Sequence, residues 1–145
     1  MTQVDFYTHV EDKCHTAALL CGKAVERGMR VVVYAPDAEI ADTVDRLLWS
    51  VPPTGFIPHC SASDELAVVT PVVIDRQTAA SSHDDLLINL DNERPTYFSR
   101  FQRLVEIVGL DERDRQAARE RYRFYRDRGY EIHSHDLSKK RRGAE

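Results

Sequence analysis

The feature that most constrains the fold is a short apolar run that no polar residue interrupts. It reads V-V-V-Y and ends the segment Arg30 to Tyr34. An unbroken β-branched run is typical of a strand buried on both faces of a parallel sheet. Further predicted strands are Val4 to Tyr7, Pro71 to Ile74 and Asp85 to Leu90. We therefore expect a core built around a parallel sheet.

Helical patterns lie between these strands. Apolar residues recur at helical spacing from Cys14 to Arg27, and again from Asp37 to Trp49 behind Pro36. Strands that alternate with helices predict right-handed βαβ units, and so an α/β, doubly wound, mainly parallel sheet with helices on both faces. Two more predicted helices are Tyr97 to Val108 and Asp111 to Arg128, and Ser50 to His59 is a predicted loop.

Length and composition indicate one globular domain. The 145 residues are 42% apolar and 30% charged, and no apolar run approaches the roughly 20 residues of a membrane helix. We expect a single domain over residues 1–137 and a basic tail over 138–145. The N-terminus has no basic leader with an apolar core, which predicts a cytoplasmic protein. Three cysteines without a CxxC pair predict free thiols.

The chain lacks the usual nucleotide-binding loops. The segment Ala17 to Ala24 is close to G-x-x-x-x-G-K-[ST], but alanine replaces both the first glycine and the hydroxyl residue. There is no G-x-G-x-x-G motif either. We therefore expect no cofactor and no small-molecule substrate.

No catalytic or metal site is predicted. The best histidine cluster is His133-Ser134-His135-Asp136, where adventitious metal binding is a better interpretation than a dedicated site. Ser81 to Asp85 contains Ser, His and Asp, but a catalytic triad is assembled across a fold. Three acids lie at predicted strand ends: Asp5, Asp75 and Asp91. A metal-dependent nuclease would use such acids as metal ligands, but we interpret them as turn and cap residues.

Positive charge is concentrated near the C-terminus. Residues 1–110 hold 9 Lys or Arg against 16 Asp or Glu, whereas residues 111–145 hold 11 against 8. The predicted helix Asp111 to Arg128 contains seven arginines and two tyrosines. At about 100° per residue, Ala117, Ala118, Phe124 and Tyr125 share one side. The other side, here called the arginine stripe, carries Arg115, Arg119, Tyr122, Arg123 and Arg126.

Two interpretations of the arginine stripe compete. It is either a solvated face whose arginines pair with Glu120 and Asp127, or a surface that binds anions through bidentate guanidinium groups. The net charge of −4 argues against long-range attraction to nucleic acid and favours a local site for a small acidic ligand or peptide.

Six segments in order resemble the chi subunit family of bacterial DNA polymerase III holoenzyme, part of its clamp-loader assembly. The resemblance covers nearly the whole domain. The segments are V-D-F-Y at Val4, R-V-V-V-Y-A at Arg30, D-R-L-L-W at Asp45, F-I-P-H at Phe56, D-L-L-I-N-L at Asp85 and A-R-E-R-Y-R-F-Y-R at Ala118.

The resemblance implies a Rossmann-like, non-catalytic adaptor that associates with DNA only indirectly. Chi proteins bind the acidic C-terminal tail of single-stranded DNA-binding protein, which ends in Asp, Asp, Asp, Ile, Pro and Phe. The tail-binding positions fall on Arg115, Arg119, Tyr122 and Arg123, with Val108 as a pocket wall. Many family members carry lysine where Arg115 and Arg123 stand, which keeps the charge but changes the donor geometry.

The resemblance also implies a second surface, for the psi subunit or for an alternative partner such as a helicase. Trp49, Pro52, Phe56 and Pro58 concentrate apolar bulk beside turn residues. Such bulk is typical of an interface, although a tryptophan that caps the core explains it equally well.

Two other functions stay open at this point. One is direct single-stranded nucleic-acid binding, with arginines on phosphates and Tyr122 or Tyr125 stacked on bases. The other is the metal-dependent nuclease.

Overall fold

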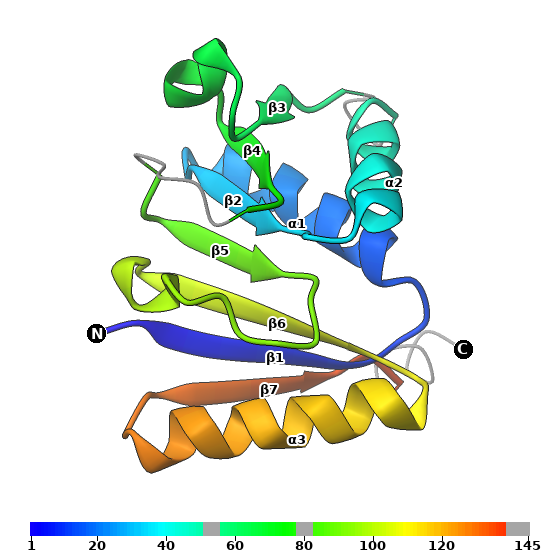
Figure 1. Ribbon diagram of the computed structural model, residues 1–145, viewed down its shortest axis with the longest axis vertical. Helices are drawn as coiled ribbons and strands as arrows, with labels where there is room; N and C mark the ends of the chain where they lie inside the picture. The colour runs from blue at the N-terminus through cyan, green and yellow to red at the C-terminus, as the bar shows by residue number, and fades with distance from the viewer. Residues whose placement is uncertain (51–55, 78–82, 139–145) are drawn as a thin grey trace.

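A computed structural model describes residues 1–50, 56–77 and 83–138. Its seven strands form one sheet in the order β3-β4-β2-β5-β6-β1-β7, and every pair of neighbours is parallel (Figure 1). The predicted α/β parallel sheet is confirmed. The strands are β1 (Gln3–Val10), β2 (Val31–Tyr34), β3 (His59–Ser61), β4 (Val72–Asp75), β5 (Leu86–Asn89), β6 (Arg103–Gly109) and β7 (Ile132–Asp136).

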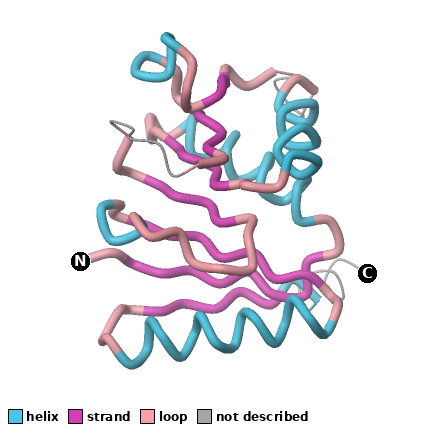
Figure 2. The backbone as a smooth tube through the Cα atoms, viewed as in Figure 1, coloured by secondary structure: helices cyan, strands magenta, loops and turns pink. Residues whose placement is uncertain are grey.

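Helices cover both faces of the sheet (Figures 1 and 2). The helices α1 (Lys13–Glu26) and α2 (Ala38–Leu48) lie on one face, and α3 (Glu112–Asp127) runs along the other beside β7. Two short 3-10 helices are η1 (Glu65–Val69) and η2 (Phe98–Arg100). None of the described helices is long and apolar enough to cross a membrane.

The sheet separates two apolar clusters. In β2, Val31 and Val33 pack in the cluster under α1 and α2, whereas Val32 packs in the cluster under α3. Successive strand residues point to opposite faces, so a strand covered on both sides needs apolar residues at consecutive positions. The V-V-V-Y run of β2 meets this requirement.

The predicted helix from Tyr97 to Val108 is wrong. The segment forms η2 and then β6, which lies between β5 and β1 in the sheet. The apolar residues of the segment fit helical spacing, but Val105, Ile107 and Val108 are β-branched and favour a strand. Glu106 breaks the apolar run, although its side chain is fully buried. Val108 accordingly lies in a strand.

Capping residues mark the helix boundaries. Asp37 and Asp111 cap α2 and α3, and the Asp111 side chain accepts a 2.7 Å hydrogen bond from the backbone N–H of Asp114. Behind α3, Gly129 adopts φ +80°, a left-handed conformation that favours glycine. The three cysteines are free.

The acids predicted as turn and cap residues have different roles. Asp75 fits, because its Oδ1 accepts a hydrogen bond from the Gln77 backbone two residues on. Asp5 does not fit, since it is buried within β1 and its Oδ2 lies 2.6 Å from Arg103 Nε. Pro52, Ser81, Ser82 and the basic run at 139–142 lie outside the described residues.

Candidate functional site: an arginine-lined groove beside helix α3

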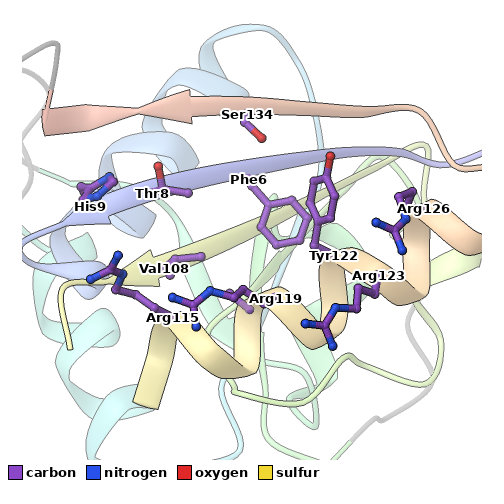
Figure 3. A pocket seen from close by; sticks show the side chains of 11 residues that line it. Phe6, Thr8, His9, Val108, Arg115, Arg119, Tyr122, Arg123, Arg126 and Ser134 are labelled. Atoms are coloured by element: carbon purple, nitrogen blue, oxygen red, sulfur yellow. The ribbon is translucent and has the colours of Figure 1, made fainter. Parts of the chain in front are cut away.

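A groove of about 360 Å³ runs between α3 and the sheet (Figure 3). All five positions predicted to hold an acidic tail line this groove: Val108, Arg115, Arg119, Tyr122 and Arg123. Arg126 of the arginine stripe also lines it. Its volume is within the range of about 300–1,000 Å³ that is usual for ligand pockets.

The floor of the groove is apolar. Phe6 of β1, Val108 of β6 and Ala118 of α3 are all buried there. The Tyr122 ring stands beside Phe6 with centroids 5.6 Å apart, and Tyr122 remains 39% exposed (Figure 3). The groove therefore offers an aromatic wall and an apolar base to a ligand side chain of moderate size.

The rim of the groove is cationic, and its ion pairs are weak. Glu112 Oε1 lies 3.2 Å from Arg119 Nη1, and Glu112 Oε2 lies 3.6 Å from Arg115 Nη1. Arg126 pairs with Asp127 at 3.1 Å. All of these side chains are exposed, where an ion pair contributes only about 0–1 kcal/mol. A ligand carboxylate can replace such pairs at little cost.

Arg123 forms no ion pair with any residue in the described ranges. A ligand carboxylate would therefore not have to displace a protein acid from it. The solvated-face interpretation predicted pairing with Glu120 and Asp127. It is correct for Asp127, but the other pairing acid is Glu112. One acid shared by two arginines leaves the stripe with an excess of positive charge.

A buried polar network holds α3 against the sheet. Glu106 of β6 accepts hydrogen bonds from Arg121 Nε at 3.1 Å, Tyr125 Oη at 2.6 Å and Asn89 Nδ2 at 2.9 Å. Burial raises the pKa of Glu106, and Arg121 and the hydrogen bonds oppose that rise. Tyr125 is fully buried, as expected for the side that faces the core. The prediction that Tyr125 could stack on bases is therefore wrong.

A second buried contact fixes the start of α3. The Asp114 carboxylate accepts hydrogen bonds from Lys13 Nζ at 2.7 Å and from the Gly109 backbone N–H at 2.9 Å. Burial acts to raise the pKa of Asp114, but the bonds from Lys13 and Gly109 outweigh it and lower the pKa. This contact joins α1, the end of β6 and α3, so the groove has a fixed shape at its Arg115 end.

His9 lies at one end of the groove, and no sequence motif points to it. The residue has φ +57° at an irregularity of β1 between Tyr7 and Val10. A left-handed residue of this kind changes the direction of the strand. Its Nδ1 lies 3.1 Å from Asp136 Oδ1 at the end of β7. The His9 ring lies at the Arg115 end of the groove (Figure 3).

The second predicted surface is an exposed aromatic pair. Trp49, which caps α2, is 59% exposed and Phe56 is 44% exposed, with ring centroids 4.8 Å apart. His59 packs edge-on against Trp49, and its Nε2 lies 2.9 Å from Asp45 Oδ1. Pro58 is exposed nearby in the chain. An exposed tryptophan does not cap the core, which argues against that alternative.

A family model described as DNA polymerase III chi subunit, HolC, matches residues 1–133. The chain belongs to the DNA polymerase III chi subunit family. The resemblance drawn from the six sequence segments is thereby confirmed.

Relatives named DNA polymerase III subunit chi occur in three bacteria. The Pseudomonas aeruginosa protein is 36% identical over 94% of this chain and 98% of its own length. The Escherichia coli K12 protein is 32% identical over 90% and 92%, and the Haemophilus influenzae protein is 28% identical over 76% and 77%. The chain thus spans most of each relative.

Among solved structures, the chi-family fold is similar to the C-terminal domain of Saccharomyces cerevisiae Dbp5, solved bound to Gle1 and IP6. The TM-score is 0.60, with 94% of this chain and 90% of the other covered. The identity is 11%, so this likeness concerns the fold alone.

The two histidines of β7 each lie near one acid. His133 Nε2 lies 3.4 Å from Glu131, and His135 Nε2 lies 3.2 Å from the buried Asp5. Within the described ranges, no group of three or more His, Cys, Asp or Glu side chains is placed to hold a metal ion. The His133 to Asp136 segment is the edge strand β7 and belongs to the sheet.

Sequence reasoning missed the residues that position the groove: Glu106, Arg121, Asp114, Lys13 and His9. Helical spacing could have found one of them. Arg121 is three residues after Ala118 and four before Tyr125, which places it on the buried side of α3. No local sequence pattern predicts the contact between Lys13 and Asp114, because 101 positions separate them in the chain.

Proposed function

We propose that this chi-family chain is a non-catalytic accessory subunit in DNA replication, which binds the acidic C-terminal tail of single-stranded DNA-binding protein in the α3 groove. It would thereby connect the DNA polymerase III clamp-loader complex, through psi, to DNA coated by that protein. The observation that supports this proposal is the arginine rim around an apolar floor, with Phe6 and Tyr122 side by side.

The chemistry of the tail complements the groove. Its aspartates and terminal carboxylate match Arg115, Arg119, Arg123 and Arg126, since guanidinium groups donate two parallel hydrogen bonds to a carboxylate. Its terminal phenylalanine matches the space between Val108, Phe6 and Tyr122, where ring contacts contribute beyond simple burial. Because the rim is exposed, the charged part of the affinity should fall as salt is added.

A peptide titration tests the tail site. A labelled peptide ending in D-D-D-I-P-F is titrated with wild type, Arg119→Ala and Tyr122→Ala. We expect both variants to bind about ten-fold more weakly or worse, as for central interface residues. Arg113→Ala is the matched control, because Arg113 is exposed on the same helix but does not line the groove. Equal affinity for all four proteins would reject the site.

The exposed aromatic pair is the proposed surface for psi, or for another partner at the same place. A pair of neighbouring aromatic rings in contact with solvent is a common centre of binding energy in protein interfaces. Trp49→Ala should lose co-purification with psi. Leu66→Ala, which removes an exposed apolar side chain on η1, should keep it. Full retention of psi by Trp49→Ala would contradict the assignment.

Direct single-strand binding by the arginine stripe is the alternative for α3. Only Tyr122 remains available for stacking there, because Tyr125 is buried. Oligonucleotide binding that falls with Tyr122→Ala while the peptide fails to bind would favour this alternative.

A further inference from the structure

The face of β1 and β7 opposite α3 holds a second groove. The helices on that face, α1 and α2, lie toward the β2 end of the sheet, with α1 packed on β2 and β6 (Figure 1). A groove of about 450 Å³ remains beside α1, lined by Tyr7 of β1, Arg103 of β6 and His135 of β7. We call it the sheet-face groove. Apolar residues of α1, β5 and β6 also line it.

The sheet-face groove has an excess of positive charge. Asp5 is neutralised by Arg103 at 2.6 Å, so Lys23 and Arg27 are set against one further acid of the lining, Asp136. Lys23 of α1 and Arg27, the C-cap residue of that helix, are four residues apart in the chain and line the groove. Neither forms an ion pair with any residue of the described part of the chain. Two cations without an ion-pair partner in the described residues therefore line this groove, in a chain whose first 110 residues are acidic overall.

The same groove presents aromatic surface. The rings of Tyr7 and His135 are stacked, with centroids 4.7 Å apart and planes 21° apart. His135 Nε2, at the edge of the ring, lies 3.2 Å from Asp5 Oδ1, and the His135 side chain stays 43% exposed. A stacked pair with one open side can extend its stack onto a further planar group.

We propose that the sheet-face groove contacts single-stranded DNA, with Lys23 and Arg27 against phosphates and a base stacked on His135. Cations that follow the backbone and aromatic rings that receive bases are the usual means of binding single strands without sequence preference. A single strand presents a phosphate and a planar base in every nucleotide, whereas a peptide offers an aromatic ring only at particular residues, so the nucleic acid is the better match.

The position of the groove gives the contact a role. Phe6 and Ser134 of β1 and β7 line the α3 groove, whereas Tyr7 and His135 of the same strands line the sheet-face groove. If the α3 groove holds the tail as proposed above, the strand coated by the same protein is close by. The tail then raises the local concentration of DNA, so that a weak contact suffices. The net charge of −4 is consistent with a contact that is weak alone.

Oligothymidine binding by the full chain at low ionic strength tests the contact. We compare wild type, the double variant Lys23→Gln/Arg27→Gln, and the control Arg46→Gln/Arg113→Gln, which removes the same charge from two exposed positions outside both grooves. We expect roughly ten-fold weaker binding for the first variant, with a salt slope reduced by about 0.7 for each lost phosphate contact, and little change for the control. His135→Ala should weaken oligothymidine binding but not binding of an abasic strand of equal length.

Cross-linking locates the contact independently. A strand that carries 4-thiothymidine should cross-link to peptides containing Tyr7 or His135. The proposal is overturned if wild type does not bind, if both double variants lose affinity equally, or if the cross-links fall on Tyr122 and its neighbours. Loss of tail-peptide binding instead of DNA binding in Lys23→Gln/Arg27→Gln would assign the face to an acidic peptide. The tail titration of Arg119→Ala is scored separately, so failure of the tail site and failure of this contact give different results.

Discussion

Arg121 carries the same charge as its neighbours on α3 but has a different task. It is buried, and its guanidinium donates to Glu106 and to the Asn92 carbonyl. Arg121→Ala leaves the Glu106 carboxylate buried without the charged partner that it has in the described structure. We expect this variant to lose about 3–5 kcal/mol in the free energy of unfolding, which is the usual cost of breaking a buried ion pair. Urea unfolding measures it.

The exposed Arg119→Ala is the comparison for this loss. It should change the free energy of unfolding by less than about 0.5 kcal/mol, as is usual for exposed positions, because its pair with Glu112 is solvated. Similar stability for the two variants would show that the Glu106 network does not hold α3.

Asp114 gives the fold a defined pH dependence. Its pKa is lowered from 3.8, so its contribution is fully present above that unfolded value and is lost as the pH falls through the lower folded pKa. Asp114→Asn should therefore be less stable than wild type at neutral pH, by about 1–3 kcal/mol. The difference should shrink as the solution is acidified below the unfolded pKa. A constant difference from neutral to acid pH would exclude the Lys13–Asp114 contact as its source.

Helix α3 shows how one element combines a structural and a binding side. Its buried line of Asp114, Ala118, Arg121 and Tyr125 fixes the helix, while the arginine stripe flanks it. The amphipathic pattern was enough to predict the helix and its stripe. The same pattern could not distinguish buried Arg121 from exposed Arg119, because Glu106, which accepts the hydrogen bond from Arg121, belongs to β6.

Glu112 competes with the proposed tail for two arginines of the stripe. Glu112→Gln removes this carboxylate and leaves Arg115 and Arg119 without their partner. We expect the tail peptide to bind about two- to five-fold more tightly, since an exposed pair is worth up to about 1 kcal/mol. Peptide titration measures this change.

Glu120→Gln is the control for the competition, because it removes the same charge from the same helix and Glu120 forms no ion pair in the described structure. An equal gain for both variants would mean that net charge alone is responsible. Unchanged affinity for Glu112→Gln would mean that the tail does not use Arg115 and Arg119.

At the scale of the whole molecule, the parallel sheet was predictable and one of its central strands was not. The apolar run in β2 indicated burial on both faces directly. In β6 the buried Glu106 interrupts such a run, and its three hydrogen-bond partners come from β5 and α3. A glutamate whose burial depends on partners from other elements is predicted from the sequence to be exposed. The groove was predicted by position from the family resemblance, whereas its supporting contacts required the fold.

The two proposed protein-binding surfaces lie toward opposite edges of the sheet. The α3 groove is beside β7, and the Trp49 cluster is beside β3, with five strands between these two edges. No described contact joins Trp49 to the groove, so we expect their binding energies to be independent, as for sites more than about 10 Å apart. Trp49→Ala should leave tail-peptide affinity within about two-fold of wild type, and Arg119→Ala should leave psi binding intact. The double variant should show both losses and no third effect. Tail affinity that changes on addition of psi to wild type would instead reveal coupling through the sheet, and calorimetric titration of each partner in the presence of the other measures it.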